Sequence, residues 1–174
     1  MKKVLIVIDM QNDFIDGALG TPEAQAIVPN VKKKIEEYKS HGDEIIFTRD
    51  THHPNYLDTN EGEHLPVEHC IYGTNGWEIC EELDVKYPFV INKGTFGYLE
   101  WGTLLQLFNS KNLKIELVGL CTDICVVSNA LILKATFPEA DITVDASCCA
   151  GVTPESHEAA LTTMKMCQVN VIGE

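Results

Sequence analysis

The sequence predicts an α/β fold: a doubly wound, mainly parallel sheet of about six strands with helices on both faces. Apolar runs of strand length recur six times along the chain, and helical patterns lie between most of them. Several of the runs are apolar at successive positions without alternation, which suits strands covered on both faces. The 174 residues fit one domain spanning 1–174.

The expected strands are short runs, several of them rich in β-branched residues, separated by longer and more polar segments. They are 4–8, 44–48, 89–92, 115–119, 142–146 and 169–173. Connections between parallel strands of one sheet are right-handed crossovers, usually through a helix. The six runs therefore fit a single parallel sheet.

The clearest helical pattern begins at Pro29, because proline fits the first turn of a helix, and it ends at Gly42. Between these two residues, apolar side chains recur on one helical face. Another helix has Thr153 as its expected N-cap and Pro154 at its first position. The helix that begins at Pro154 is expected to end at 167, and two further helices are expected at 99–109 and 123–135.

Composition and charge exclude several classes of partner. The formal net charge of −13 repels nucleic-acid phosphates and anionic membrane surfaces. The apolar run at the N-terminus is cut at Asp9, short of a signal-peptide core, and no stretch approaches the roughly 20 apolar residues of a membrane span. Seven cysteines, an odd number, make free thiols the default. We expect a cytoplasmic homo-oligomer that acts on a small molecule.

Chemically active side chains follow four of the expected strands. In a parallel sheet the carboxyl ends of all strands lie on one edge, where ligands bind. Asp9 follows the first strand, Asp50 and His52 follow the second, Lys93 follows the third, and Cys121–Cys125 follows the fourth. Residues that are scattered through the sequence are thus expected to be neighbours.

Cys125 is interpreted as a nucleophile, with inert packing as the alternative for an isolated cysteine. It lies where a strand gives way to a helix, and the helix dipole and Lys93 both favour a thiolate. Asp9 can take the thiol proton and return it to a leaving amine, although its negative charge opposes thiolate formation. The two effects on the thiol pKa are expected to cancel in part. Taken singly, Asp9 could be a solvated strand end and Lys93 a surface residue.

The long polar segment 49–78 is a candidate metal site, since long loops in compact domains are usually functional. Asp50 and His52 point the same way in extended chain, and His69 can fold back onto them. One carboxylate and two imidazoles suit a divalent zinc, manganese or iron ion, and Glu61 could add a second carboxylate. A hydrogen-bonded polar loop without metal is the alternative.

Four aromatic residues border the same edge and are candidates for the walls of a substrate pocket, although core packing is expected for at least two of them. They are Phe14, Trp77, Phe96 and Tyr98. Three histidines are expected on the surface, namely His41, His64 and His157.

Five segments together resemble the isochorismatase-like cysteine hydrolases, with nicotinamidase the nearest named branch. They are "VIDMQNDF" (7–14), "RDTH" (49–52), "PVEHCIYGTNGWE" (66–78), "NKGTFGY" (92–98) and "VGLCTDICV" (118–126). The resemblance spans nearly the whole chain in the right order. True isochorismatases lack the nucleophilic cysteine, so Cys125 favours the amidase branches.

The resemblance implies a cysteine amidohydrolase that converts a small carboxamide to a carboxylate and ammonia through a thioester, with nicotinamide to nicotinate as the leading reaction. The residues implied are a triad of Asp9, Lys93 and Cys125, metal ligands Asp50, His52 and His69 with Glu61 as a possible fourth, and oxyanion donors in the amides of Cys121 and Cys125. It also implies a cis peptide between Leu120 and Cys121.

Two departures leave the substrate open. Nicotinamidases often carry tryptophan at the positions that hold Thr51 and Leu65 here. The alternatives are therefore another small amide, such as an N-carbamoyl or ureido compound, and a non-catalytic binding protein that kept the fold.

Overall fold

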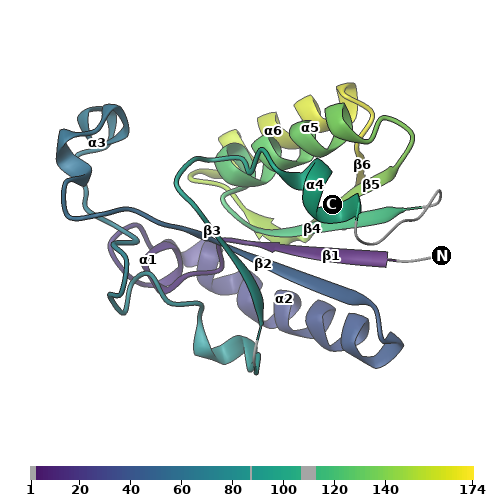
Figure 1. Ribbon diagram of the computed structural model, residues 1–174, viewed down its shortest axis with the longest axis horizontal. Coiled ribbons are helices and arrows are strands. Elements are labelled where there is room, and N and C mark those ends of the chain that lie inside the picture. The colour runs from purple at the N-terminus through teal and green to yellow at the C-terminus, as the bar shows by residue number, and fades with distance from the viewer. Residues whose placement is uncertain (1–2, 87, 107–112) are drawn as a thin grey trace.

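The computed structural model describes residues 3–86, 88–106 and 113–174, and it shows one six-stranded sheet between two layers of helices (Figure 1). The strand order is β3-β2-β1-β4-β5-β6, and every pair is parallel. The strands are β1 (Lys3–Ile8), β2 (Glu44–Asp50), β3 (Phe89–Lys93), β4 (Lys114–Leu120), β5 (Asp141–Ala150) and β6 (Asn170–Ile172). The predicted fold class is confirmed.

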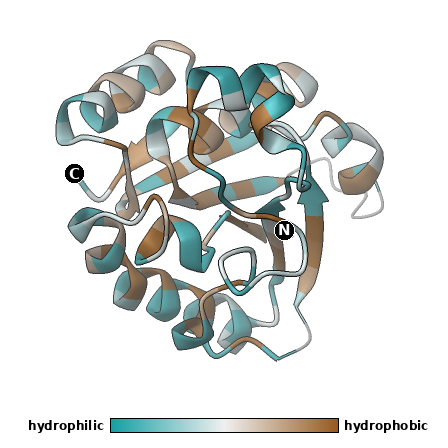
Figure 2. Ribbon diagram, turned by 90° about the vertical axis from the view of Figure 1, so that its left-hand side faces the viewer, coloured by the Kyte–Doolittle hydropathy of each residue, from teal (hydrophilic) through white to brown (hydrophobic). Residues whose placement is uncertain are grey.

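The central strand β1 is buried on both faces. Ile6 and Ile8 pack on the side of α4 (Trp101–Leu105), α5 (Val127–Thr136) and α6 (Pro154–Met166), whereas Leu5 and Val7 pack on the side of α2 (Pro22–His41). All four side chains are fully buried. The strands are accordingly mostly hydrophobic, while the helices alternate between hydrophobic and hydrophilic residues (Figure 2).

Helix α2 begins earlier than the sequence analysis predicted. It starts at Pro22, and the Thr21 side chain accepts a hydrogen bond of 3.0 Å from the Ala24 N–H at its N-terminus. Pro29 lies inside the helix and does not begin it. The predicted end is correct, because Gly42 caps the helix in the left-handed conformation. Thr21 followed by Pro22 is the stronger start signal, since it provides both the cap and a proline in the first turn.

Other element bounds also differ from the prediction, as two examples show. β5 continues past 146 to Ala150, and its register with β4 shifts between Leu117 and Gly119. The shorter helix α4 replaces much of the predicted 99–109, of which residues 107–109 lie outside the described part of the chain. Helix α6 begins at Pro154 with Thr153 as its N-cap, as predicted.

The strand order places a topological switch point between β1 and β4, which are neighbours although β2 and β3 separate them in sequence. In doubly wound sheets the ligand crevice opens at this point, outside the carboxyl ends of the strands. The connection after β1 leads to β2 and the connection after β4 leads to β5, so the two connections leave this point in opposite directions. Asp9 follows β1 directly and Cys121 follows β4 directly, so both lie at the switch point.

The long segment between β2 and β3 contains only short helices, η1 (Tyr56–Asp58), α3 (Asn60–His64) and η2 (Glu81–Leu83). An isolated bridge between Gln11 and Ile79 ties it to the chain just after β1, and a second bridge, between His52 and Ile71, lies within the segment. A further short helix, α1 (Asn12–Ile15), follows β1. None of the helices described here is long and apolar enough to cross a bilayer.

Candidate active site

Asp9, Lys93 and Cys125 meet at the switch point, fully enclosed by protein. The Lys93 Nζ lies 2.6 Å from Asp9 Oδ2 and donates to Cys125 Sγ at 3.5 Å. The exposed fractions of the three residues are 0%, 3% and 4%. Asp9 adopts a positive φ of 47°, and Thr48 fixes its carboxylate by donating to Oδ1 at 2.6 Å. The lysine therefore bridges a carboxylate and a thiol away from bulk water.

The charges of this cluster are strongly interdependent. Burial raises the pKa of Asp9, and the neighbouring Lys93 only partly opposes this rise. For Lys93, burial alone would lower the pKa, but the charges of Asp9, Cys125 and Asp50 outweigh burial and raise it. The lysine therefore stays protonated, which keeps one positive charge available for whichever of its neighbours is negative.

The thiol of Cys125 behaves differently from the expectation that opposing effects cancel. Burial raises its pKa well above the ordinary value, Asp9 raises it further, and Lys93 lowers it by less than the two together. The effects of the lysine, the helix and the carboxylate on the thiol pKa can be expected from the sequence, whereas the desolvation of the buried sulfur cannot. The resting site therefore holds a thiol, and a thiolate forms only when its proton can be transferred.

Cys125 lies in a π-helical turn, Thr122–Val126, between β4 and α5. The wide turn closes through the Val126 N–H, which donates to the Cys121 carbonyl at 3.0 Å. The peptide bond between Leu120 and Cys121 is cis, as the resemblance implied. Just before it, Gly119 approaches β1 so closely that a Cβ there would lie 2.1 Å from the Ile8 carbonyl oxygen.

The first turn of α6 and the loop before it pack against this π-helical turn. Thr122 is completely buried, and its hydroxyl lies 2.8 Å from Nδ1 of His157. The Asp123 carboxylate accepts a hydrogen bond from the Val152 N–H at 3.2 Å. His157, expected on the surface, is thus a half-buried partner of the turn.

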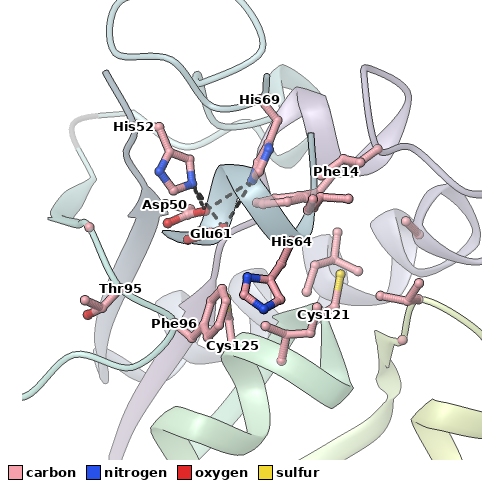
Figure 3. A pocket seen from close by; sticks show the side chains of 18 of the residues that line it. Phe14, Asp50, His52, Glu61, His64, His69, Thr95, Phe96, Cys121 and Cys125 are labelled. Carbon is pink, nitrogen blue, oxygen red and sulfur yellow. Dashed lines mark hydrogen bonds and ion pairs between the residues drawn. The ribbon is translucent and has the colours of Figure 1, made fainter. Parts of the chain in front are cut away.

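Four potential metal ligands converge beside the triad. Asp50 is the last residue of β2, and the other three lie in the long segment that follows it. Their ligand atoms lie within 4.8 Å of one another (Figure 3). His52 Nε2 lies 3.0 Å from Asp50 Oδ2 and 3.5 Å from Glu61 Oε1. His69 Nε2 lies 3.7 Å and 3.8 Å from the same two oxygen atoms. Two carboxylates and two imidazoles in this arrangement fit a divalent metal ion.

The ring orientation of His69 supports that fit. Its Nδ1 donates to the Val67 carbonyl at 2.8 Å, which leaves the Nε2 lone pair facing the cluster. Burial raises the pKa of Asp50, but the neighbouring His52 and His69 side chains and the Lys93 ammonium lower it by more, so the carboxylate is ionised. Asp50 also lies 3.7 Å from the Lys93 Nζ, which joins the metal cluster electrostatically to the triad.

Gln11 was not identified from the sequence, although it has a direct structural role at this cluster. Its Oε1 accepts from the Asp50 N–H at 2.7 Å, and its Nε2 donates to the carbonyls of Asp50 and Trp77 at 2.9 Å each. Similarly, Asp13 accepts from the N–H of Cys70 at 2.7 Å, next to His69. The motif "DMQND" thus supplies Asp9 of the triad and two residues, Gln11 and Asp13, whose side chains hold the backbone beside the metal cluster. In the sequence, only their regular spacing of two residues marks these three positions.

A cavity of about 920 Å³ opens onto the triad and the metal cluster. Phe14 and Phe96 line it, as do Cys121 and Cys125. Trp77 and Tyr98 do not line it, which agrees with the expectation that at least two of the four aromatic candidates have a packing role. Trp77 is covered by the Arg49 guanidinium at 3.4 Å from its ring centroid, and Tyr98 packs in the core.

Asn129, one helical turn after Cys125, is another residue of the site that was not identified from the sequence. It is completely buried, and its Nδ2 donates to the carbonyls of Cys125 at 2.8 Å and Phe96 at 3.1 Å. Its Oδ1 accepts from the Tyr98 N–H and the Trp101 Nε1–H, both at 2.9 Å. One side chain therefore joins the nucleophile turn to the cavity wall that carries Phe96.

A parallel sheet with this strand order, and with a carboxylate, an ammonium and a thiol gathered at its switch point, defines a doubly wound α/β protein with a candidate ligand site at that point. The chain belongs to the isochorismatase family, since the model of the isochorismatase domain matches residues 3–173.

Named relatives in this family cleave amides. The nicotinamidase/pyrazinamidase of Mycobacterium tuberculosis is 26% identical over 98% of each chain. The zinc complex of the pyrazinamidase of Pyrococcus horikoshii has a TM-score of 0.85 and 28% identity over 100% of both chains. The N-carbamoylsarcosine amidase of Thermoplasma acidophilum has a TM-score of 0.82 and 26% identity, covering 99% of this chain and 96% of that one. These relatives place the protein among amidohydrolases that act on C–N bonds.

We expect Asn129→Ala to lower the free energy of unfolding by roughly 2–4 kcal/mol, because it leaves several buried donors and acceptors without partners. Urea unfolding measures this. Ser128→Ala is the matched control, since Ser128 also donates to a carbonyl of the same turn, that of Ile124 at 2.6 Å, and its loss should cost less than about 1 kcal/mol. Equal losses in the two variants would contradict the role of Asn129 as a hub.

Proposed function

We propose that the protein is a cysteine amidohydrolase that releases ammonia from a small carboxamide through a thioester on Cys125, with nicotinamide to nicotinate as the leading reaction. The observation that carries the proposal is the buried Lys93 ammonium between the Asp9 carboxylate and the thiol of Cys125, a residue that lines the cavity. A core-packing cysteine needs no charged neighbours, and burying such charges is costly.

Acylation begins with transfer of the thiol proton to Asp9. The raised pKa of Asp9 and that of Cys125 show that burial disfavours the anionic form of each, and Lys93 can stabilise the negative charge on either one. The thiolate then attacks the amide carbonyl carbon, and the carbonyl oxygen becomes an oxyanion. We assign the backbone amides of Cys121 and Cys125 as its donors, and such donors are worth about 3 kcal/mol each.

Collapse of the tetrahedral intermediate breaks the C–N bond, and Asp9 returns the proton to the leaving nitrogen, so that ammonia departs. A water molecule then gives a proton to Asp9 and attacks the thioester carbonyl. Collapse of this second intermediate breaks the C–S bond, Asp9 returns its proton to the sulfur to restore the thiol, and the acid product loses its own proton to leave as the carboxylate. Lys93 remains protonated throughout and compensates the negative charge at each stage.

Asp50, His52, His69 and Glu61 would hold a divalent metal ion. Such an ion supplies a Lewis-acid position that can anchor a ring nitrogen, directly or through a bound water. The protein residues orient the rest of the substrate, with Phe14 and Phe96 lining the space between this cluster and Cys125. A flat pyridine carboxamide suits that arrangement.

A second candidate is an N-carbamoyl or ureido substrate. The observation in its favour is the cavity, which at about 920 Å³ lies near the upper end of the range for small-molecule sites and admits more than one planar ring. The N-carbamoylsarcosine amidase among the structural neighbours is compatible with this option. Both candidates use the same triad and differ only in the groups bound beyond the scissile amide.

We expect Cys125→Ala to abolish ammonia release from a panel of small amides, because only this sulfur contacts Lys93. The matched control is Cys121→Ala, which removes a thiol from the same cavity but keeps the backbone amide, and it should retain most of the activity. Burial raises the pKa of the Cys121 thiol to about 12, as it raises that of Cys125, but among the described residues the Lys93 ammonium donates to the Cys125 sulfur and not to that of Cys121. Equal loss in the two variants would refute the assignment, and no release by the native protein would favour the non-catalytic alternative.

We also expect one divalent metal to copurify with the protein, and the double variant His52→Ala, His69→Ala to lack it. Elemental analysis of the untreated protein measures this directly. His53→Ala is the control, because this neighbouring imidazole is exposed and outside the cluster. A metal-free preparation with full activity would contradict the anchoring role and support the second substrate candidate.

A further inference from the structure

His64 is a cavity residue that the proposed mechanism does not use. The sequence analysis expected it on the surface, and its side chain is indeed exposed, but it lines the cavity. In Figure 3 its ring lies between Phe96 and Cys121, on the open side of the metal cluster. Outside that cluster and the two cysteines, it is the only titratable side chain among the described residues that line the cavity.

The segment that carries His64 is held in place at several points. The hydroxyl of Thr59 accepts from the Gly62 N–H at 3.1 Å and donates to the Tyr56 carbonyl at 2.6 Å. The Tyr56 hydroxyl donates to the Leu65 carbonyl at 2.9 Å. Gly62 is packed so closely that a Cβ would lie 2.2 Å from the Tyr56 carbonyl oxygen. The backbone of α3 therefore has a defined position over the cavity.

The imidazole ring of His64 is also oriented. Its Nδ1 lies 2.8 Å from the Asn60 carbonyl oxygen, and because a carbonyl only accepts, Nδ1 carries the proton. In the neutral ring, Nε2 then carries the lone pair and acts as an acceptor. Nε2 has no hydrogen-bond or ion-pair partner within the part of the chain that the structure describes.

We propose that His64 is a specificity-determining residue whose Nε2 accepts a hydrogen bond from an N–H or O–H group of the substrate. The substrate class is then a small amide that carries such a donor in addition to the scissile carboxamide, for example an amino-substituted ring carboxamide or a ureido compound. This inference rests on the proposed amide hydrolysis and deepens it by naming a second recognition group. Neither the triad nor the metal cluster provides a free acceptor at this position.

The test uses pairs of amides that differ only in the donor, a ring amino group against a ring methyl group at the same position. The native protein should prefer the amino member in kcat/KM by about tenfold, the size of one net hydrogen bond. His64→Leu should abolish this preference without changing kcat/KM for the methyl member. His64→Gln should keep most of it, because its side-chain amide oxygen is a hydrogen-bond acceptor. His53→Leu is the control, an exposed histidine that does not line the cavity, and it should change nothing.

An unaltered preference in His64→Leu would overturn the inference, and so would an equal loss for both members of each pair. Calorimetric affinities of the same pairs for Cys125→Ala separate this inference from the proposed function. If the native protein hydrolyses none of the amides, the proposed function fails, and the affinities then decide the role of His64. A tenfold affinity difference that disappears when His64→Leu is added supports the inference, and its absence overturns it.

Discussion

The buried ammonium of Lys93 is the interaction on which the rest of the site depends. It lies 2.6 Å from Asp9, 3.5 Å from Cys125 and 3.7 Å from Asp50, so one cation balances the triad carboxylate, the thiol and a metal ligand. Removing one member of a buried charge cluster typically costs several kcal/mol, since its partners remain desolvated. Catalytic geometry and stability are therefore coupled at this lysine.

The sheet explains how these groups come together. Because β1 lies between β2 and β4, the ends of β1, β2 and β3 deliver Asp9, Asp50 and Lys93 to one edge, while β4 delivers the nucleophile turn. The register of these parallel pairs matters for the site, since a slip by one residue would turn the side chains at the strand ends to the opposite face of the sheet. The hydrophobic core thus positions the polar edge.

The fold was predictable from the apolar runs, whereas helix starts and side-chain environments were less so. The start of α2 was misplaced because Pro29 fits a first turn in isolation, although Thr21 and Pro22 repeat the Thr-Pro pattern that correctly marked α6. Strand ends identified the residues that the structure gathers at the site, and their catalytic roles stay predictions. Burial was not predictable from local sequence, so the raised pKa of the Cys125 thiol was missed, and the sequence could not tell which of the four aromatic residues pack away from the cavity.

The central claim is that amide cleavage passes through a covalent bond to Cys125, and trapping that bond tests it most directly. Rapid acid quenching during turnover of a hydrolysed amide, followed by proteolysis and mass spectrometry, should show the acyl group of the substrate on the peptide that contains Cys125. The adduct should be absent before substrate is added and after the substrate is exhausted. Sustained turnover by Cys125→Ala, or an acyl group found only on another residue, would contradict the account.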